Sequence, residues 1–291
     1  MDNIIEIKNI NKTFNATKVL NNITFSVKKG EIIGLVGLNG AGKSTLISII
    51  LNIIKPDYGE IIFNKELSTT IGVMLQEISM PENIKVKELV QMILKFSHPK
   101  MNLDELLKIS NLTLQSNCYC SKLSGGKQRA LQFCLAIANN PDILFLDEPT
   151  VGMDFEAKNK FWEYIFNIAK DKTIILTSHD IEEIESISNR ILILDKGSIK
   201  LDTSTNKLKQ SLKYSKYISV SFNELIYNLL KNNKISNVEK YSIEHEILLI
   251  YSNNISKTIT DLLNNKISID DIEIKNAGLE IFLKEHLCSV I

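Results

Sequence analysis

The sequence predicts an α/β fold: a mainly parallel, helix-covered sheet forms the larger part, and a small α+β domain follows it. Short, wholly apolar runs such as Ile32–Val36 and Ile143–Leu146 have the length and composition of buried strands. Helical segments such as Phe155–Ala169 alternate with further strands, which is typical of a parallel sheet. With 291 residues, 44% of them hydrophobic, the chain can form one large domain plus a small one.

The first half of the chain consists of predicted strands followed by a helical stretch. Residues 77–122 are helical in character and interrupt the strand pattern, so we interpret them as an insertion between two halves of the sheet. Within this stretch, Asn102 and Glu105 have the spacing of a capping box. In order, the predicted strands are Ile4–Ile10, Ile23–Val27, Ile32–Val36, Glu60–Phe63 and Thr70–Leu75, and the predicted helices are Ile47–Ile54 (stopped by Pro56), Val86–Phe96 and Asn102–Ile109.

The second half resumes the alternation and then changes character. The polar stretch 202–210 is predicted to be a linker, which divides the chain into domains 1–210 and 211–291. Beyond the linker, the order βαββαβ plus a final helix is typical of a small split-βαβ domain. The elements are Ile143–Leu146, Phe155–Ala169, Thr173–Thr177, Asp180–Ser188 and Ile191–Leu194, then Tyr217–Phe222, Glu224–Asn232, Val238–Ile243, Glu246–Tyr251, Ile255–Asn264, Ile267–Ile274 and Leu279–Leu287.

Composition excludes several classes of protein. Lys plus Arg and Asp plus Glu each number 34, so there is no basic excess of the kind that a general nucleic-acid binder carries. Cys118 and Cys120 have no second pair at zinc-ligand spacing, which favours free thiols over a metal site. The N-terminus lacks the pattern of a secretory signal, and no apolar run approaches the ~18–20 residues of a spanning helix. We therefore expect that the chain does not cross a membrane by itself.

A phosphate-binding loop is predicted directly after the strand Ile32–Val36. Glycines allow backbone N–H groups to surround phosphate oxygens at a helix N-terminus. Lys43 can reach the β- and γ-phosphates of a nucleotide, and the Ser44 hydroxyl can hold Mg²⁺. A chance glycine-rich turn is a weak alternative, because the loop follows an apolar strand and opens a helix. The eight residues that match G-x-x-x-x-G-K-[ST] are Gly37, Leu38, Asn39, Gly40, Ala41, Gly42, Lys43 and Ser44, and Thr45 directly after them is included in the predicted site.

Two adjacent carboxylates end a second buried strand. Asp147 closes the run Ile143–Leu146, where a second Mg²⁺-organising carboxylate is expected. Glu148 comes next, at the carboxyl end of the strand, which in open α/β sheets faces the ligand crevice. We assign Asp147 to the metal and Glu148 to polarising the attacking water. An acidic turn capped by Pro149 would be the simpler interpretation if the phosphate loop were absent.

Five further segments, in order along the chain, resemble the ABC ATPase family. Leu123-Ser124-Gly125-Gly126-Lys127 looks like the family signature LSGGQ, Gln76 resembles the Q-loop residue, and Val151-Gly152-Met153-Asp154 resembles the D-loop. His179 resembles the switch histidine, and Phe14 lies where the family places an aromatic residue that stacks on adenine. The resemblance covers about residues 1–210. It implies a P-loop NTPase core of the ABC ATPase type, with a mainly parallel sheet, an antiparallel N-terminal subdomain and a helical insertion.

The resemblance also implies roles for these residues. Ser124, Gly125 and Gly126 would contact the γ-phosphate of ATP held by a second ATPase subunit, in a head-to-tail dimer with Asp154 at the shared site. Gln76 would contact Mg²⁺ and transmit the change to a partner, and His179 would contact the γ-phosphate. Lys127 departs from the commoner Gln of the signature and Met153 from the frequent Leu of the D-loop. Both half-sites are complete, which is compatible with a homodimer, and a heterodimer stays open.

Within the family, the chain is most similar to the motors of ABC-2-type exporters of drugs and antibiotics. The segment Leu146–Ala157 and the closing element Leu279–Lys284 carry this similarity. It implies an ATPase at the cytoplasmic face of the membrane, bound to a separate integral-membrane permease. A soluble ABC ATPase of translation or DNA repair and the motor of an importer stay open as alternatives.

Overall fold

A computed structural model describes residues 3–64, 70–76, 79–96, 101–168, 171–178, 180–211 and 216–276. The chain divides into two compact units, residues 1–205 and 206–291, and we describe each by itself. The α/β fold class predicted from the sequence is confirmed. The closing element predicted at Leu279–Leu287 lies outside the described residues, as does His179.

A six-stranded sheet forms the centre of the first unit. Its strand order is β5-β6-β7-β3-β8-β9; the first five strands are parallel, and β9 pairs antiparallel with β8. Every residue of β3, β6 and β7 is buried, as expected for strands that are covered on both faces. The strands are β3 (Ile32–Val36), β5 (Ile71–Met74), β6 (Ile143–Asp147), β7 (Thr173–Thr177), β8 (Arg190–Asp195) and β9 (Ser198–Ser204).

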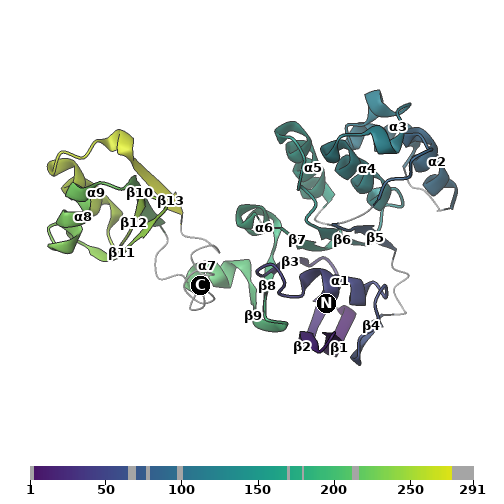
Figure 1. The fold of residues 1–291 in the computed structure, drawn as a ribbon, viewed down its shortest axis with the longest axis horizontal. Coiled ribbons are helices and arrows are strands. Elements are labelled where there is room, and N and C mark those ends of the chain that lie inside the picture. The colour runs from purple at the N-terminus through teal and green to yellow at the C-terminus, as the bar shows by residue number, and fades with distance from the viewer. Residues whose placement is uncertain are drawn as a thin grey trace. The chain divides into compact units, whose positions relative to one another are not determined.

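An antiparallel sheet and one helix cover one face of the central sheet. Strands β1 (Asn3–Phe14), β2 (Thr17–Lys28) and β4 (Tyr58–Phe63) pair in the order β2-β1-β4. Helix α1 (Lys43–Ile50) lies with them on this side, and α4, α5 and α6 lie on the other side (Figure 1). Apolar residues of β1, β2, α1 and β3 form one continuous core. This core fixes the position of α1, whose first residue is Lys43.

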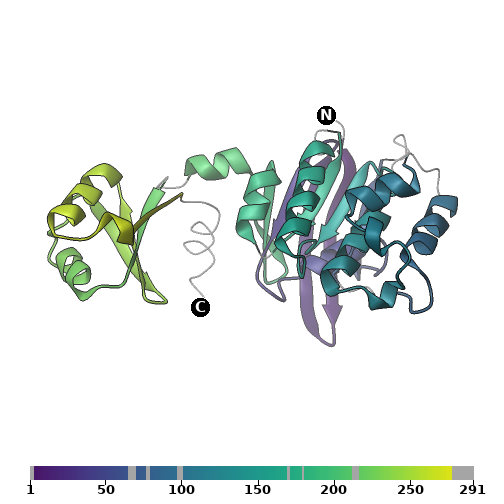
Figure 2. The same cartoon turned by 90° about the horizontal axis from the view of Figure 1, so that it is seen from above.

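Helices account for most of the region between β5 and β6. Helix α3 (Leu103–Ile109) confirms the predicted capping box: Glu105 N donates to Asn102 Oδ1 at 2.9 Å, and Asn102 N donates to a Glu105 carboxylate oxygen at 3.0 Å. Figure 2 shows this helical region at one side of the first unit. The remaining helices of the unit are α2 (Val86–Phe96), η1 (Thr113–Gln115), η2 (Cys120–Lys122), α4 (Gly125–Ile137), α5 (Phe155–Ile168) and α6 (Ile181–Ile187).

The second unit contains a four-stranded antiparallel sheet in the order β11-β12-β10-β13, with two helices packed on one face. Its chain order is βαββαβ, a split-βαβ arrangement. Alternate strand residues such as Ile218 and Ile250 are fully buried against Ile226 and Leu262 of the helices. The elements are β10 (Lys216–Ser221), α8 (Glu224–Lys231), β11 (Val238–Glu244), β12 (Ile247–Ser252), α9 (Ile255–Asn264), η3 (Ile269–Asp271) and β13 (Ile272–Asn276).

The segment 202–210, predicted to be a linker, forms regular secondary structure, and the boundary between the two compact units lies within it. Its first residues complete β9, and the rest form α7 (Thr205–Ser211). Most side chains of β9 are polar, because this strand lies at the edge of the sheet and is only partly buried. Asp202 is held there by a two-pronged interaction with Arg190, at 2.6 Å for each nitrogen. Polarity alone therefore did not distinguish an edge strand from a linker.

Two other predicted boundaries are also wrong. The helix predicted at Ile47–Ile54 begins at Lys43 and ends at Ile50, because its first turn is formed by the polar phosphate loop and Asn52 takes a left-handed conformation with φ of 57°. The strand predicted to begin at Ile267 begins at Ile272. The Ser268 side chain accepts a hydrogen bond from Asp270 N and starts the short helix η3 instead.

Candidate active site

The loops that follow four neighbouring parallel strands meet at one edge of the central sheet. Strands β5, β6, β7 and β3 lie side by side, so their carboxyl ends share this edge. Gln76 follows β5, Asp147 ends β6, Ser178 follows β7, and the phosphate loop follows β3. In open α/β sheets this edge holds the ligand crevice. The topology therefore brings together residues that are far apart in the sequence.

A cavity of about 300 Å³ lies at this edge. It holds most of the residues predicted for phosphate, metal and water chemistry, and adds Val19 from β2. The residues that line it are Val19, Asn39, Gly40, Gly42, Lys43, Ser44, Thr45, Gln76, Asp147 and Glu148.

The backbone of the phosphate loop depends on glycine at position 42. Gly42 has φ of 105°, which is outside the range of ordinary residues, and it is the N-cap of α1. A Cβ atom here would lie 2.8 Å from a Leu20 methyl group and 2.9 Å from the Val19 carbonyl oxygen. Only a residue without a side chain therefore allows α1 to begin here with its N–H groups directed at the cavity.

Lys43 supplies a buried ammonium group to the same loop. Its Nζ donates to the Gly37 carbonyl oxygen at 2.7 Å and lies 3.3 Å from that of Leu38. Burial lowers the pKa of Lys43, and the charges of Glu148 and Asp147 oppose that effect. Among the described residues, this ammonium donates to neutral carbonyl oxygens. It favours an anionic ligand, because a phosphate would replace weak acceptors with strong ones.

Asp147 and Glu148 are both 2% exposed, and Thr177 positions them. The Thr177 hydroxyl donates to Asp147 Oδ1 at 2.6 Å and accepts from Glu148 N at 3.0 Å. Asp147 and Thr177 are register partners on β6 and β7, so the parallel pairing places the hydroxyl between the two acidic residues. Glu148 has φ of 51°, which is uncommon for a residue with a side chain and frequent at functional sites.

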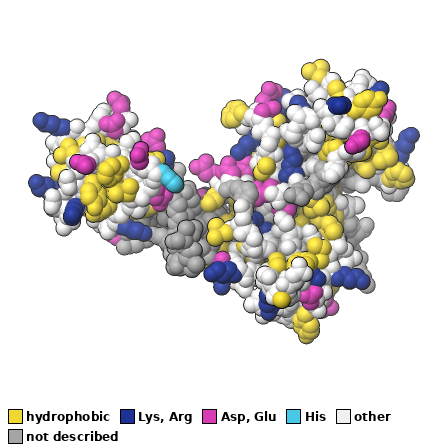
Figure 3. All heavy atoms as spheres, viewed as in Figure 1, with side chains coloured by type: hydrophobic (Ala, Val, Ile, Leu, Met, Phe, Trp, Pro, Cys, Tyr) yellow, Lys and Arg dark blue, Asp and Glu magenta, His cyan; other side chains and the backbone are white. Residues whose placement is uncertain are grey.

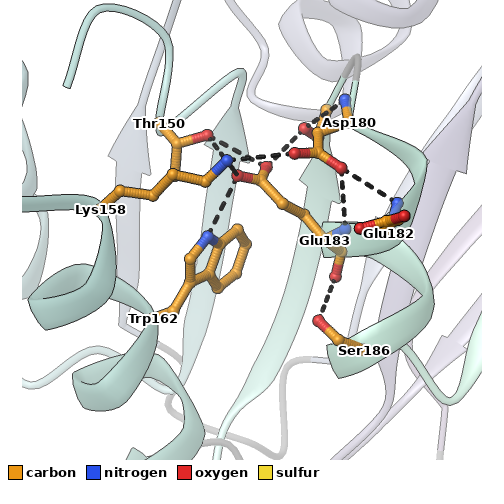
Figure 4. A network of polar contacts seen from close by, with 8 residues as sticks. Thr150, Lys158, Trp162, Asp180, Glu182, Glu183 and Ser186 are labelled. Atoms are coloured by element: carbon orange, nitrogen blue, oxygen red, sulfur yellow. Dashed lines mark hydrogen bonds and ion pairs between the residues drawn. The ribbon is translucent and has the colours of Figure 1, made fainter. Parts of the chain in front are cut away.

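A second polar network lies beside the cavity and centres on Glu183 (Figure 4). Its buried carboxylate accepts from Thr150 at 2.9 and 3.0 Å, from Ser178 at 2.6 Å and from the Trp162 indole at 3.2 Å. Lys158 Nζ is 2.7 Å from the same carboxylate. Glu183 thus joins the loop after β6 to the loop after β7.

The signature segment opens helix α4 outside this cavity. Ser124 is the N-cap of α4, and its side chain makes no capping hydrogen bond to the described residues. A Cβ atom on Gly126 would lie 2.6 Å from the Gly152 carbonyl oxygen, so the close approach of these two loops requires glycine there. A Cβ atom on Gly125 would meet no described atom within 4 Å. The fold of the described chain therefore does not explain the glycine at 125.

Other predicted site residues also lie outside the cavity lining. Phe14 is 41% exposed at the end of β1, with Lys12 Nζ 5.2 Å from the ring centroid. Leu38 is exposed and Ala41 is buried beneath the loop. Asp154 caps α5, since its Oδ1 accepts from Ala157 N at 2.8 Å.

Sequence reasoning missed Val19, Arg129, Thr177 and Glu183. Each carried only a weak signal: Thr177 is a polar residue that closes an apolar strand, and Arg129 is one charge before the largely apolar part of α4. Glu183 is one of several acidic residues in α6, so nothing in the sequence marks it as the buried one.

The side chains and loop amides of the cavity fit a nucleoside triphosphate with a divalent cation. No group of three or more His, Cys, Asp or Glu side chains suited to a metal converges in the part of the chain that the structure describes. Bound Mg²⁺ would instead draw its oxygen ligands from Ser44, Gln76, Asp147 and the phosphates, as is usual for this ion. The loop amides and Lys43 provide a cradle for the phosphates.

Comparison with known proteins supports this interpretation. A family model described as ABC transporter matches residues 20–151. A Nod factor export ATP-binding protein I from Rhizobium sp. strain N33 is 34% identical over 66% of this chain and 68% of its own length. A methionine import ATP-binding protein MetN from Lactobacillus acidophilus is 31% identical over 92% of this chain and 84% of its own length. The chain belongs to the ABC transporter family of ATP-binding proteins.

Solved cassettes extend the likeness to three dimensions. A dimeric bacterial ABC transporter cassette has a TM-score of 0.62 and 26% identity, covering 69% of this chain and 98% of its own. A second structure of the same cassette, with the same values, is a post-hydrolysis state bound to ADP and Pi. This ABC protein accordingly binds and hydrolyses ATP. Within the described ranges, every helix is too short or too polar to span a bilayer.

Proposed function

We propose that this protein is the ATP-hydrolysing motor of an ABC exporter, working through a separate integral-membrane permease on a drug, antibiotic or similar compound. The single observation that carries the motor function is the cavity in which Lys43, Ser44, Gln76, Asp147 and Glu148 meet. Export is supported by the Nod factor export relatives and by the resemblance of the segment Leu146–Ala157 to ABC-2-type exporters.

Each residue of the cavity has a proposed part in hydrolysis. The loop amides from Gly37 to Thr45 bind phosphate oxygens, and Lys43 neutralises charge on the β- and γ-phosphates. Mg²⁺, held by Ser44, Asp147 and Gln76, would supply Lewis-acid stabilisation of phosphate charge when it is bound. Glu148 accepts a proton from, and orients, the attacking water. His179 is proposed to contact the γ-phosphate.

The working unit is proposed to be a head-to-tail dimer, most simply a homodimer. Ser124, Gly125 and Gly126 then close over ATP bound by the other subunit, with Asp154 nearby and Phe14 against the adenine. The absence of a structural reason for glycine at 125 supports this assignment, because a partner's nucleotide would supply one. The solved cassette of similar fold is also dimeric.

The helical region is the proposed permease contact, which places the protein peripherally on the cytoplasmic face of the membrane. Met92, Phe96 and Leu114 are large apolar side chains that are 41%, 85% and 90% exposed. Figure 3 shows apolar side chains at the surface over this region, and interspersed acidic and basic ones elsewhere on the same face. Exposed apolar surface of this kind is typical of protein contacts. We propose residues 1–210 as the nucleotide-binding domain and 211–291 as an accessory domain.

The transport assignment can be tested by affinity purification. Tagged Glu148→Gln protein, incubated with MgATP, would be recovered from detergent-solubilised cells and its partners identified by mass spectrometry. We expect a polytopic membrane protein in near-equal amount, with Lys43→Ala protein, whose ATP binding should be weakened, as the matched control. Recovery of ribosomal or DNA-repair proteins without a membrane protein would contradict the transport role and favour a soluble ABC ATPase.

An importer motor is the second candidate, and one observation favours it. The alignment with MetN covers 92% of this chain, whereas the alignments with the export proteins cover 66%. The importer relative therefore also matches the region of the second unit. A permease recovered together with an extracellular substrate-binding protein would favour import.

A further inference from the structure

Arg129 is a buried arginine whose hydrogen bonds within the described part of the chain go to main-chain carbonyls and one side-chain amide, and to no carboxylate. It is 7% exposed in the second turn of α4. Nη1 donates to the carbonyl oxygens of Leu75 at 2.7 Å and Gln76 at 3.2 Å, and to Gln132 Oε1 at 2.6 Å. Nη2 donates to the Asp147 carbonyl oxygen at 3.1 Å and to that of Glu148.

Burying such a cation is costly, so a specific gain has to offset the cost. Burial lowers the pKa of Arg129, and the charges of Asp147 and Glu148 act in the opposite direction. A guanidinium is the side chain suited to this position, because its planar set of donors can reach acceptors on two sides at once. A lysine at 129 has a single charged nitrogen and could not span the same carbonyls.

These contacts connect three parts of the site. Arg129 lies five residues after Ser124 on α4, so it moves with the signature segment. One side of its guanidinium holds the main chain at Gln76, and the other holds the main chain at Glu148. The Glu148 residue is thereby fixed at both ends: its N–H donates to Thr177, and its carbonyl accepts from Arg129.

We propose that Arg129 is a positioning residue that holds Glu148 in its left-handed conformation and ties it to Gln76 and to the signature helix. Glu148 at φ of 51° is a strained residue that persists only when its surroundings enforce it. Without the guanidinium, the carboxylate would sample orientations that do not face the water. Arg129 would also let the position of α4 determine whether Glu148 is aligned. This inference rests on the proposed role of Glu148.

The test is single-turnover hydrolysis of MgATP by the full chain carrying Arg129→Lys. We expect the rate of hydrolysis to fall about 10–100-fold, the range seen when outer-shell partners of a site are removed. ATP affinity should stay within about threefold, because Arg129 does not line the cavity. Arg190→Lys is the matched control: this half-buried arginine on β8 also loses hydrogen bonds, but it contacts Asp202 and Glu31 and not the site.

A double-mutant cycle separates positioning from a general structural effect. In the Glu148→Gln background, Arg129→Lys should cause little further loss, because the group it positions is already gone. An equal further loss would overturn the inference, as would a wild-type rate for Arg129→Lys alone. If Glu148→Gln alone hydrolysed ATP at the wild-type rate, the proposed role of Glu148 would fail instead.

A second variant keeps the inference testable if Arg129→Lys does not fold. Gln132→Met removes the side-chain acceptor that orients the guanidinium and leaves the charge in place. We expect a smaller loss of hydrolysis, about threefold to tenfold, that again disappears in the Glu148→Gln background. A loss that persists in that background would contradict positioning through Glu148.

Discussion

Lys43 is buried and donates hydrogen bonds to carbonyl oxygens, which the phosphates of bound ATP can replace as acceptors. Replacing Lys43 with Ala should therefore weaken ATP binding about 10–100-fold, since hydrogen bonds to charged groups contribute about 1.5–3 kcal/mol. A titration with a fluorescent ATP analogue would measure the change. Lys160→Ala is the control, because Lys160 is paired with Glu156 on the exposed side of α5. Equal affinity for Lys43→Ala and wild type would remove Lys43 from the phosphate site.

A thiol on α4 makes stability depend on pH. Burial raises the pKa of Cys134 to about 11, against about 8.5–9 in an unfolded chain. The folded protein thus keeps a proton that the unfolded chain loses. The contribution of the protonated Cys134 thiol to the free energy of unfolding is complete below pH 8.5, and it falls by about 1.4 kcal/mol per pH unit up to pH 11.

Urea unfolding at pH 8, 9 and 10 would measure this effect. We expect wild type to lose free energy of unfolding faster than Cys134→Ala as the pH rises, so that the difference between the two proteins shrinks. A difference that stays constant from pH 8 to pH 10 would contradict the raised pKa. Other groups titrate in this range, but they are common to both proteins.

Site residues that belong to a local sequence motif were predicted, and residues that reach the site through tertiary contacts were missed. Lys43, Ser44, Asp147 and Glu148 follow apolar strands at fixed spacing, so local pattern and topology sufficed to place them. The contacts of Arg129 could be recognised only in the folded structure, where its side chain on α4 reaches the main chain of both Gln76 and Asp147. Its partners are main-chain carbonyls, which every sequence contains, so no residue type marks the contact.

At the scale of elements, the two glycines of α4 are predicted to behave in opposite ways. Gly126→Ala should destabilise the protein by about 1–3 kcal/mol, because its Cβ would meet the Gly152 carbonyl oxygen. Gly125→Ala should leave stability unchanged or raise it by up to about 1 kcal/mol, because alanine favours the helix. In the proposed dimer, however, Gly125→Ala should slow ATP hydrolysis.

Thermal unfolding and ATPase assays on the two variants, run side by side, would check this. Full activity in Gly125→Ala would argue against nucleotide contact at the signature segment. Each variant serves as the control for the other, since both add one methyl group to the same helical turn.

Elements were predictable where one physical signal dominated. Strands β3 and β7 were predicted at their observed bounds, because strands covered on both faces are largely apolar. The end of edge strand β9, residues 202–204, was mistaken for part of a linker, because the pairing of β9 with β8 depends on a neighbour that the local sequence does not indicate. Helix α1 was predicted to begin at Ile47 and begins at Lys43, since its first turn is built from the residues of the phosphate loop.

At the scale of the whole molecule, the two units have separate hydrophobic cores. One core contains residues of β1, α1 and β6, and the other contains residues of β10, α8 and α9. A chain ending at residue 211 should therefore still fold and bind MgATP within about threefold of the full chain. Nucleotide titration and circular dichroism would test this, and an unfolded or non-binding truncation would show that the first unit depends on the second.

Hydrolysis and dimerisation by Glu148→Gln test the proposed function most directly. The structure places Glu148 against the cavity beside Asp147, and the proposal makes it the group that activates water. We expect single-turnover hydrolysis to be about 10²–10⁴-fold slower than wild type. Light scattering should show a dimer with MgATP and a monomer without it. Hydrolysis at the wild-type rate, with no ATP-dependent dimer, would contradict the proposed role of Glu148 in an ATP-driven dimer.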